Sequence, residues 1–334
     1  MLTLGIESSC DDTAAAILQD GDTLMSSVIS SQDTIHSRFG GVVPELASRR
    51  HLECIYPVVQ EALGRAGVLI SDIDLIAVTQ GPGLIGSLLV GFSYAKAVSY
   101  ISKIPFIGID HMAGHLLSVF LEEEKPQFPF IALIVSGGTS SLFHCASYID
   151  FTLLGRTRDD AAGEAFDKVA KFIGLGYPGG PRVAETAQSG DRKAIAFPRA
   201  WLEEDSLDFS FSGLKTAVLN HCHIKKEKNE ELHIPDLTAS FQEAVVEVLV
   251  EKTMLAVRKT SLSTVVMGGG VSANRRLREV MRKRCDETGK KLFIPRPLFC
   301  TDNGAMIALA GYFQYRKTDP TQYNQDVYSR SQLG

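Results

Sequence analysis

The chain opens with LTLGIESSCDDTAAAIL, residues 2–18, in which two apolar runs flank a polar turn. Short apolar runs joined by a few turn residues predict two paired strands. The arrangement returns in FIALIVSGGTSSLF, residues 130–143, where a Gly-Gly pair separates the two runs. Gly-Gly is a strong hairpin signal, because glycine adopts the backbone angles that tight turns require. The repeated pattern indicates two related halves.

A second correspondence supports this duplication. The apolar run at residues 75–79 and the one at residues 264–267 each lead into a glycine-rich loop and then into a helical pattern. Strands that alternate with helices predict an α/β protein. We therefore expect an α/β fold of two duplicated lobes, residues 1–129 and 130–334, with a central cleft.

Composition limits the class of protein. The chain has 334 residues, 45% hydrophobic and 22% charged, which is enough for about two globular lobes of roughly 100–200 residues and too apolar for disorder. No window reaches the roughly 18 consecutive apolar residues of a spanning helix, and the first residues lack a signal-peptide pattern. The six cysteines form no C-x-x-C pair, as is typical of reduced thiols. We expect a cytoplasmic protein without a membrane segment.

A net charge of −5 means that nucleic acid could be bound only by a local basic surface. The best candidate is a predicted helix and its end, with the cations Arg275, Arg276, Arg278, Arg282, Lys283, Arg284, Lys290 and Lys291. Such a run is also typical of a solvated helix face, so both interpretations stay open. The polar stretch at residues 221–235 is predicted to be a surface loop, since its spacing fits no standard metal cage.

The motif HMAGH places His111 and His115 four residues apart, hence on one face of a helix. Zinc peptidases need a glutamate beside the first histidine as general base, and here Met112 stands there, so peptidase chemistry loses its proton acceptor. Asp302, in CTDNG, would complete a two-histidine, one-carboxylate site suited to iron(II) or zinc. The alternatives are a structural histidine pair and an N-cap role for Asp302.

Three glycine-rich turns are candidates for phosphate binding, namely Gly137-Gly138, Gly179-Gly180 and Gly268-Gly269-Gly270. Backbone N–H groups at such turns and at helix N-termini attract anions. Any one of these turns alone is more often simply a turn. Taken together, they favour a nucleotide lying in the cleft.

Two groups of carboxylates accompany these turns. Asp160, Glu164 and Asp167 share one helical stripe by their i, i+4, i+7 spacing, and pairing with a lysine would offset their repulsion. Alternatively, Asp167 accepts hydrogen bonds from ribose hydroxyls. Asp11 and Asp12, in the first turn, are available for general-base or metal-water chemistry, or they cap the segment that follows.

The sequence resembles the bacterial TsaD family, formerly Gcp, which makes threonylcarbamoyladenosine in tRNA. The resemblance covers nearly the whole chain and rests on the motifs GIESSCDDT, FGGVVPELASRRH, TQGPGLIGSLLVG, HMAGH, VSGGT, DDAAGEAFDK, GYPGGP, DFSFSGLKTA, GGGVSANRRLR and CTDNGAMIA. In this order and spacing the set is very specific. It implies an actin-like ATPase (ASKHA) fold of two RNase H-like lobes, which agrees with the duplication.

The resemblance also implies a reaction, in which the threonylcarbamoyl group moves from threonylcarbamoyl-AMP to the N6 amine of adenosine 37 in tRNAs that read ANN codons, with release of AMP. It implies that His111, His115 and Asp302 hold one divalent metal per subunit, Fe²⁺ in preference to Zn²⁺. The implied substrate contacts are Ile134, Val135, Ser136, Gly137, Gly138, Asp167, Gly180 and Asn274. The implied partners are tRNA, a paralogous TsaB subunit in a heterodimer, the TsaE ATPase and an enzyme that makes the donor.

Three departures from the family pattern limit what carries over. The family usually has CDET where this chain has CDDT, residues 10–13, so the general base is Asp11 or Asp12. The histidine of SGGHT is absent from residues 136–140, and the C-terminal tail differs from Tyr328 onward.

Two other functions stand as alternatives. One is a kinase or ATPase of the same fold, which is disfavoured because phosphoryl transfer uses magnesium on carboxylates rather than imidazoles. The other is a non-catalytic scaffold, which we would expect to lack the metal residues.

Overall fold

The structure, a computed structural model, describes residues 1–203 and 205–333. The chain forms two compact units. Unit 1 contains Met1–Pro126, Ala146–Phe151 and the described chain from Pro295 onward, and unit 2 contains Gln127–Cys145 and Thr152–Ile294.

The prediction assigned all residues after 129 to the second lobe. In the structure, the chain from Pro295 onward belongs to unit 1. After Ile294 the chain forms α10 (Pro297–Cys300) and α11 (Gly304–Tyr315), and α11 packs on the sheet of unit 1. This helix is buried on almost every side, because its sequence is apolar around the whole circumference.

Unit 1 is built on a five-stranded sheet with the order β3-β2-β1-β4-β5. Its strands are β1 (Leu2–Glu7), β2 (Asp12–Gln19), β3 (Thr23–Ser31), β4 (Leu75–Gly81) and β5 (Phe106–Asp110). β1 to β3 are antiparallel, while β4 is parallel to both β1 and β5. The first predicted hairpin is confirmed, with Glu7 opposite Ala14.

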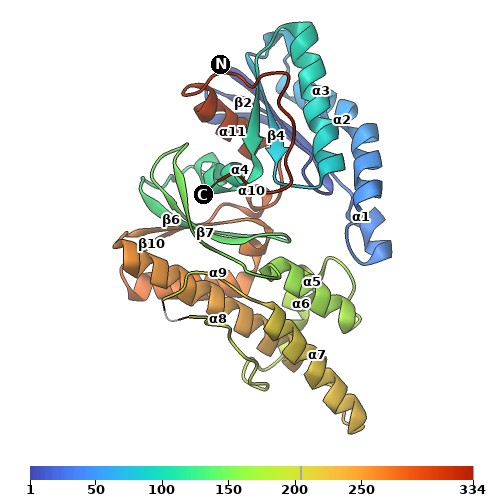
Figure 1. Ribbon diagram of the computed structural model, residues 1–334, viewed down its shortest axis with the longest axis vertical. Coiled ribbons are helices and arrows are strands. Elements are labelled where there is room, and N and C mark those ends of the chain that lie inside the picture. The colour runs from blue at the N-terminus through green and yellow to red at the C-terminus, as the bar shows by residue number, and fades with distance from the viewer. Residues whose placement is uncertain (204, 334) are drawn as a thin grey trace. The chain divides into compact units, whose positions relative to one another are not determined.

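Helices cover both faces of this sheet (Figure 1). Leu4 and Ile6 pack in one core with residues of α2 (Pro44–Ala66) and α3 (Ile85–Ser102). Gly5, between them, points to the opposite face because side chains alternate along a strand. A Cβ there would lie 2.1 Å from the Gly304 carbonyl oxygen, so only glycine lets α11 approach so closely. Besides α10, the short helices of this unit are α1 (Asp33–His36) and α4 (His111–Leu117).

Unit 2 repeats the plan of unit 1. Its strands are β6 (Phe130–Val135), β7 (Ser140–Cys145), β8 (Phe151–Arg156), β9 (Thr264–Gly268) and β10 (Lys291–Phe293). The order β10-β9-β6-β7-β8 is that of unit 1 read from the other edge, so the duplication is confirmed. The second predicted hairpin is confirmed too, with Val135 opposite Ser140.

The core of unit 2 forms on one face of its sheet, where Ile131, Leu133 and Val135 pack with apolar helix residues. The helices are α5 (Ala162–Phe172), α6 (Gly179–Thr186), α7 (Ser212–Glu227), α8 (Ile234–Thr260) and α9 (Arg275–Glu287). Within the described residues, no helix combines the length and the apolar character that crossing a bilayer requires.

The predicted surface loop at residues 221–235 is wrong in its first half. α7 continues to Glu227, because no glycine or proline follows Gly213 within the helix. The chain leaves the helix at Asn229, which has a positive φ of 51°. The last residues of the predicted loop also belong to a helix, since α8 begins at Ile234.

Candidate metal centre and nucleotide-binding loops

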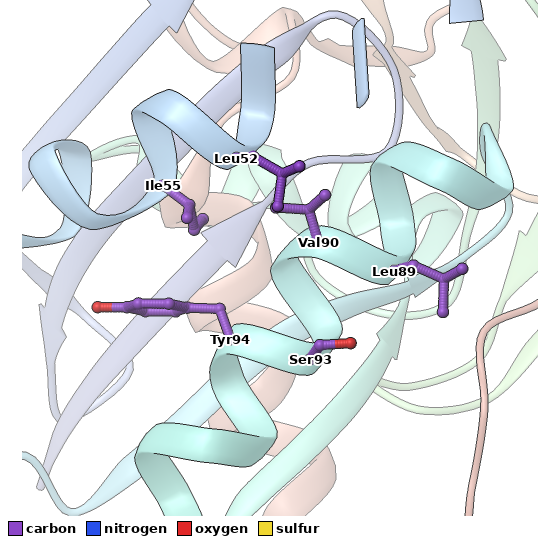
Figure 2. A pocket seen from close by; sticks show the side chains of 6 residues that line it. All are labelled: Leu52, Ile55, Leu89, Val90, Ser93 and Tyr94. Atoms are coloured by element: carbon purple, nitrogen blue, oxygen red, sulfur yellow. The ribbon is translucent and has the colours of Figure 1, made fainter. Parts of the chain in front are cut away.

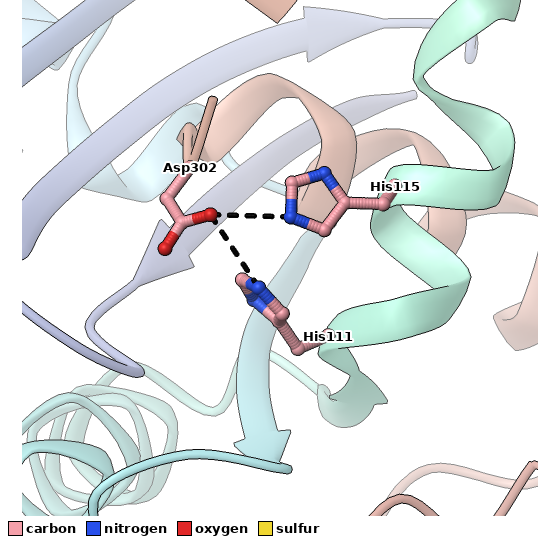
Figure 3. Close-up of side chains that lie close together, drawn as sticks. All are labelled: His111, His115 and Asp302. Atoms are coloured by element: carbon pink, nitrogen blue, oxygen red, sulfur yellow. Dashed lines mark hydrogen bonds and ion pairs between the residues drawn. The ribbon is translucent and has the colours of Figure 1, made fainter. Parts of the chain in front are cut away.

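The two histidines of the predicted metal site lie on α4, which begins where β5 ends. Asp110, the last residue of β5, caps the helix by accepting a hydrogen bond from the Met112 amide at 2.9 Å. His111 and His115, one turn apart, project from the same side of α4 (Figure 3). The prediction that the HMAGH spacing places both histidines on one helical face is therefore confirmed.

The C-terminal tail stabilises the start of this helix. Oδ2 of Asp110 accepts hydrogen bonds from the Tyr328 hydroxyl at 3.1 Å, the Ser331 hydroxyl at 2.9 Å and the Gln332 amide at 3.1 Å. The tail thus has a structural role in unit 1 that no motif indicated.

Asp302 approaches α4 from the segment before α11 (Figure 3). Its Oδ1 lies 3.1 Å from Nε2 of His115 and 3.4 Å from Nε2 of His111. The alternative of an N-cap is wrong, because Asn303 caps α11 by accepting a hydrogen bond from the Met306 amide at 2.9 Å. Asp302 is therefore available to the histidines.

The donor set fits a divalent cation. The ligand atoms of His111, His115 and Asp302 all lie within 4.8 Å of one another. Two ligands about 2.0–2.2 Å from one ion are separated by roughly 3 Å or somewhat more, as these atoms are. Nδ1 of His115 is buried and has no hydrogen-bond partner among the described residues, so its Nε2 is the nitrogen that the chain directs at Asp302.

Glu7 is a site residue that the sequence analysis missed. It ends β1 with a fully buried side chain, and its Oε2 lies 2.9 Å from Nδ1 of His111. The same carboxylate accepts hydrogen bonds from the Thr79 hydroxyl at 2.6 Å and from the Ser9 amide. An acid inside an otherwise apolar strand pattern was the available signal, since a buried carboxylate needs partners.

These charges stabilise one another. Burial opposes ionisation of His111, but the carboxylates of Glu7 and Asp302 more than offset it and raise its pKa well above the ordinary value. Burial likewise opposes ionisation of both acids, yet the imidazoles hold the pKa of Glu7 and of Asp302 below their usual ranges. These shifts favour the ionised forms of Glu7, Asp302 and His111, so a cation that binds Nε2 of His111 would displace a proton from it.

Asp11 is the last residue of the turn between β1 and β2, and Asp12 is the first residue of β2; both are partly exposed. Burial is the main cause that raises the pKa of each, and the charges of Asp302 and Asp11 help to raise that of Asp12 to about 7. A carboxylate whose pKa lies near neutrality suits a general base.

His51 of α2 fixes this turn and was also missed by the sequence analysis. It is completely buried. Its Nδ1 lies 2.7 Å from the Thr13 hydroxyl, and its Nε2 lies 2.9 Å from the Cys10 carbonyl oxygen. Because these bonds flank Asp11 and Asp12, His51 restrains the segment that carries both acids.

In unit 2, the predicted substrate residues at the end of β6 divide into two kinds. The side chains of Ile134 and Val135 are fully buried, so only their backbone could meet a ligand. The turn that follows is closed by a hydrogen bond of 2.8 Å from the Ser136 amide to the Thr139 carbonyl. Gly137 and Gly138 are exposed, and a Cβ on either would meet nothing within 4 Å.

The other predicted substrate residues have structural bonds of their own. Asp167 accepts a hydrogen bond of 2.7 Å from the Gly179 amide. This bond anchors the start of α6, where the space around Gly180 is open. Asn274 caps α9 by accepting from the Leu277 amide at 3.0 Å, and its Nδ2 donates to Gln242 at 2.8 Å. Their substrate roles stay predictions.

The predicted helical stripe is wrong at its first member, because α5 begins at Ala162 and Asp160 precedes it. Lysines neutralise Asp160 and Glu164. Asp160 lies 2.7 Å from Nζ of Lys168 and 2.6 Å from Nζ of Lys215. Glu164 lies 2.8 Å from the same Lys168 amine. Ion pairing within the fold therefore accounts for this part of the stripe.

Carboxylates also neutralise much of the basic helix α9. Arg276 forms a pair with Glu243 of α8 at 2.6 Å, and Arg284 forms one with Glu251 at 2.8 Å. Arg275 pairs with a glutamate one turn along α9 at 2.8 Å. These bonds favour the structural interpretation of α9 over that of a nucleic-acid surface.

Comparison with known proteins places these features in context. A family model described as "TsaD: tRNA N6-adenosine threonylcarbamoyltransferase" matches residues 23–309. A tRNA N6-adenosine threonylcarbamoyltransferase of Desulfotalea psychrophila is 61% identical over 337 residues, which cover 100% of this chain and 98% of the relative. The protein of the same name from Syntrophus aciditrophicus is 54% identical, covering 99% and 97%.

Solved structures with low sequence identity share the fold. HypF from T. kodakarensis aligns with a TM-score of 0.63 at 13% identity, over 94% of this chain and 48% of that one. Component A of the Acidaminococcus fermentans (R)-2-hydroxyglutaryl-CoA dehydratase aligns with a TM-score of 0.55 at 16% identity, over 95% and 100%. At such identities the likeness concerns the fold alone, which is the actin-like ATPase fold expected from the sequence.

Proposed function

Because the chain belongs to the TsaD family of tRNA N6-adenosine threonylcarbamoyltransferases, we propose that it transfers the threonylcarbamoyl group of threonylcarbamoyl-AMP to adenosine 37 of tRNAs that read ANN codons. The N6 amine attacks the acyl carbon, a new C–N bond forms, and the C–O bond to the phosphate breaks. AMP leaves and the amine loses one proton. The cluster of His111, His115 and Asp302 is the observation that carries this proposal.

The three ligands would hold one divalent metal, because two histidines and one carboxylate with open positions suit both Fe²⁺ and Zn²⁺. The family resemblance favours Fe²⁺ of the two. When bound, the metal supplies Lewis-acid polarisation of the acyl carbonyl. An aromatic amine is a poor nucleophile, so the reaction needs both polarisation and alignment. The tail bonds at Asp110 keep α4 in place for this task.

Asp11 and Asp12 are the proposed proton acceptors. Asp12 is favoured, because its raised pKa of about 7 makes it the stronger base. A base of this strength is still largely ionised slightly above neutral pH and can take the proton that the attacking amine loses. His51 keeps the turn rigid, so that the carboxylates need no reorganisation at the moment of reaction.

Unit 2 would bind the nucleotide part of the donor. Gly137 and Gly138 offer amide groups beside open space, and Gly180 does the same at the start of α6. The proposed contacts before this turn are the backbone of Ile134, Val135 and Ser136. Asp167 and Asn274 are proposed substrate contacts as well, and their present bonds hold the loops that carry such contacts. Backbone amides without a neighbouring Cβ suit phosphate oxygens.

We propose the paralogous TsaB subunit as a partner at the outer side of α2 and α3. There a shallow apolar groove is lined by Leu52, Ile55, Leu89, Val90, Ser93 and Tyr94 (Figure 2). Leu52 is 67% exposed and Leu89 is 40% exposed. Apolar side chains that gather on one exposed surface are typical of protein interfaces. TsaE and tRNA complete the proposed set of partners.

Reconstitution tests the proposed function. The purified chain is combined with the partner proteins, threonine, bicarbonate, ATP and unmodified tRNA, and labelled threonine in the nucleic acid is measured. We expect incorporation with the complete set and none when this chain is omitted. Equal incorporation without the chain would overturn the proposal. An Asp302→Asn variant then separates catalysis from scaffolding, because a scaffold would support incorporation without the metal ligand.

A further inference from the structure

The two histidines of the metal site differ in what holds their second nitrogen. Both direct Nε2 at Oδ1 of Asp302, at 3.4 Å for His111 and 3.1 Å for His115. Nδ1 of His115 has no partner among the described residues. Nδ1 of His111 lies 2.9 Å from Oε2 of Glu7 and 3.2 Å from the Ser9 hydroxyl. A second hydrogen-bonding group therefore fixes the ring of His111, whereas no such group among the described residues contacts Nδ1 of His115.

Hydrogen-bond donors surround the carboxylate of Glu7. Its side chain has no exposed surface. Oε1 accepts from the Ser9 amide, and Oε2 accepts from the Thr79 hydroxyl at 2.6 Å and faces the His111 ring. A carboxylate held by two other donors cannot turn away from His111. The imidazole must then carry a hydrogen on Nδ1, which leaves Nε2 for a metal.

We propose that Glu7 is a positioning residue of the metal centre. It fixes the orientation and the tautomer of His111, so that Nε2 is the metal-binding nitrogen, and it makes that nitrogen a stronger donor. Glu7 touches neither the metal nor the substrate. The inference rests on the proposed metal centre, and it deepens that proposal by assigning the buried acid at the end of β1 to it.

Metal titration of the purified full chain tests the role of Glu7. Cobalt(II) serves as the probe, and its affinity is measured by absorption and by competition with a chelator. We expect Glu7→Gln to weaken binding roughly 10- to 100-fold. Glutamine has one acceptor oxygen, so its amide group must face either the Ser9 amide or His111. Ser9→Ala is the matched control, because it removes the other neighbour of the same nitrogen without changing charge, and we expect less than about a threefold change.

Three outcomes would overturn the inference. The first is cobalt affinity in Glu7→Gln within about threefold of the wild type, and the second is equal weakening in Ser9→Ala. The third uses the unmodified chain and holds even if Glu7→Gln fails to fold. Nitrogen-15 NMR of the zinc-loaded protein should show His111 with its proton on Nδ1, and metal bound at Nδ1 contradicts the proposal.

A separate variant distinguishes failure of this inference from failure of the metal centre itself. His111→Ala should abolish cobalt binding whatever Glu7 does. If His111→Ala and Glu7→Gln both bind cobalt normally, the metal centre is wrong. If only Glu7→Gln binds normally, the centre stands and the positioning role of Glu7 falls.

Discussion

The turns after β1 and after β6 occupy equivalent positions in two sheets of the same strand order, yet they carry opposite kinds of residue. The first turn lies among charged groups: the buried Glu7 precedes it, Asp11 ends it and Asp12 follows it. The second turn exposes Gly137 and Gly138 with open space around both. In the proposed function, side chains would provide the chemistry of unit 1, whereas backbone amides would bind the nucleotide in unit 2.

The largest effect should come from the metal ligands of unit 1. His111→Ala removes a donor from the cluster, and we expect transfer of labelled threonine to fall roughly 1000-fold, since Lewis-acid polarisation contributes several kcal/mol. Bound metal, measured by mass spectrometry, should fall with it. Nucleotide affinity, measured by calorimetry, should stay within a factor of about three. If nucleotide binding were lost as well, metal binding in unit 1 and nucleotide binding in unit 2 would not be separate functions.

Asp12→Asn should lower transfer by about 100-fold, which is the lower range for loss of a general base. The same change should stabilise the metal-free protein at alkaline pH. The pKa of Asp12 is raised to about 7 in the fold, so its ionisation opposes folding. That penalty is absent below the unfolded pKa near 4, grows as pH rises and is complete above about 7.

Thermal unfolding at two pH values checks this second expectation. The melting temperature of Asp12→Asn should exceed that of the wild type at pH 8 and equal it near pH 3.5. Asp11→Asn is the matched control for charge at the turn. Equal transfer activity in both single variants would contradict the choice of Asp12 as the base.

Gly138→Trp addresses the backbone chemistry of unit 2. A Cβ there meets no atom of the protein within 4 Å, so we expect the fold to tolerate a side chain, which would occupy the space before the amides. We expect nucleotide affinity to fall about tenfold or more, with metal content unchanged. Gly213→Trp is the control, because its surroundings are equally open and it lies on α7. Unchanged affinity in Gly138→Trp would remove this turn from the site.

Arg276→Ala should have the smallest effect. It leaves Glu243 without its partner at 2.6 Å, and we expect a loss of about 1 kcal/mol in the free energy of unfolding. Affinity for tRNA should change little, because this arginine is engaged within the fold. Arg282→Ala, for which no ion pair is recorded in the described chain, is the comparison. A marked loss of tRNA binding in Arg276→Ala would support the interpretation of α9 as a nucleic-acid-binding surface.

Local sequence determined much of this protein. The apolar runs and their turns predicted both hairpins, because strand pairing across a short turn depends on neighbouring residues. The i, i+4 spacing alone placed His111 and His115 on one helical face. The family motifs added the fold and the activity, which periodicity could not supply. The error at residues 221–235 was local as well, since a charged stretch can continue a helix when nothing interrupts it.

Only the tertiary structure decided which distant groups meet. Asp302 reaches His115 from 187 residues away, and Glu7 reaches His111 from 104 residues away. No local pattern encodes such contacts, because they follow from how α11 and β1 pack together, at Gly5 and Gly304. Burial, which exists only in the folded chain, explains two further properties. It makes Glu7, at the end of β1, depend on hydrogen-bond donors within the protein, and it raises the pKa of Asp12.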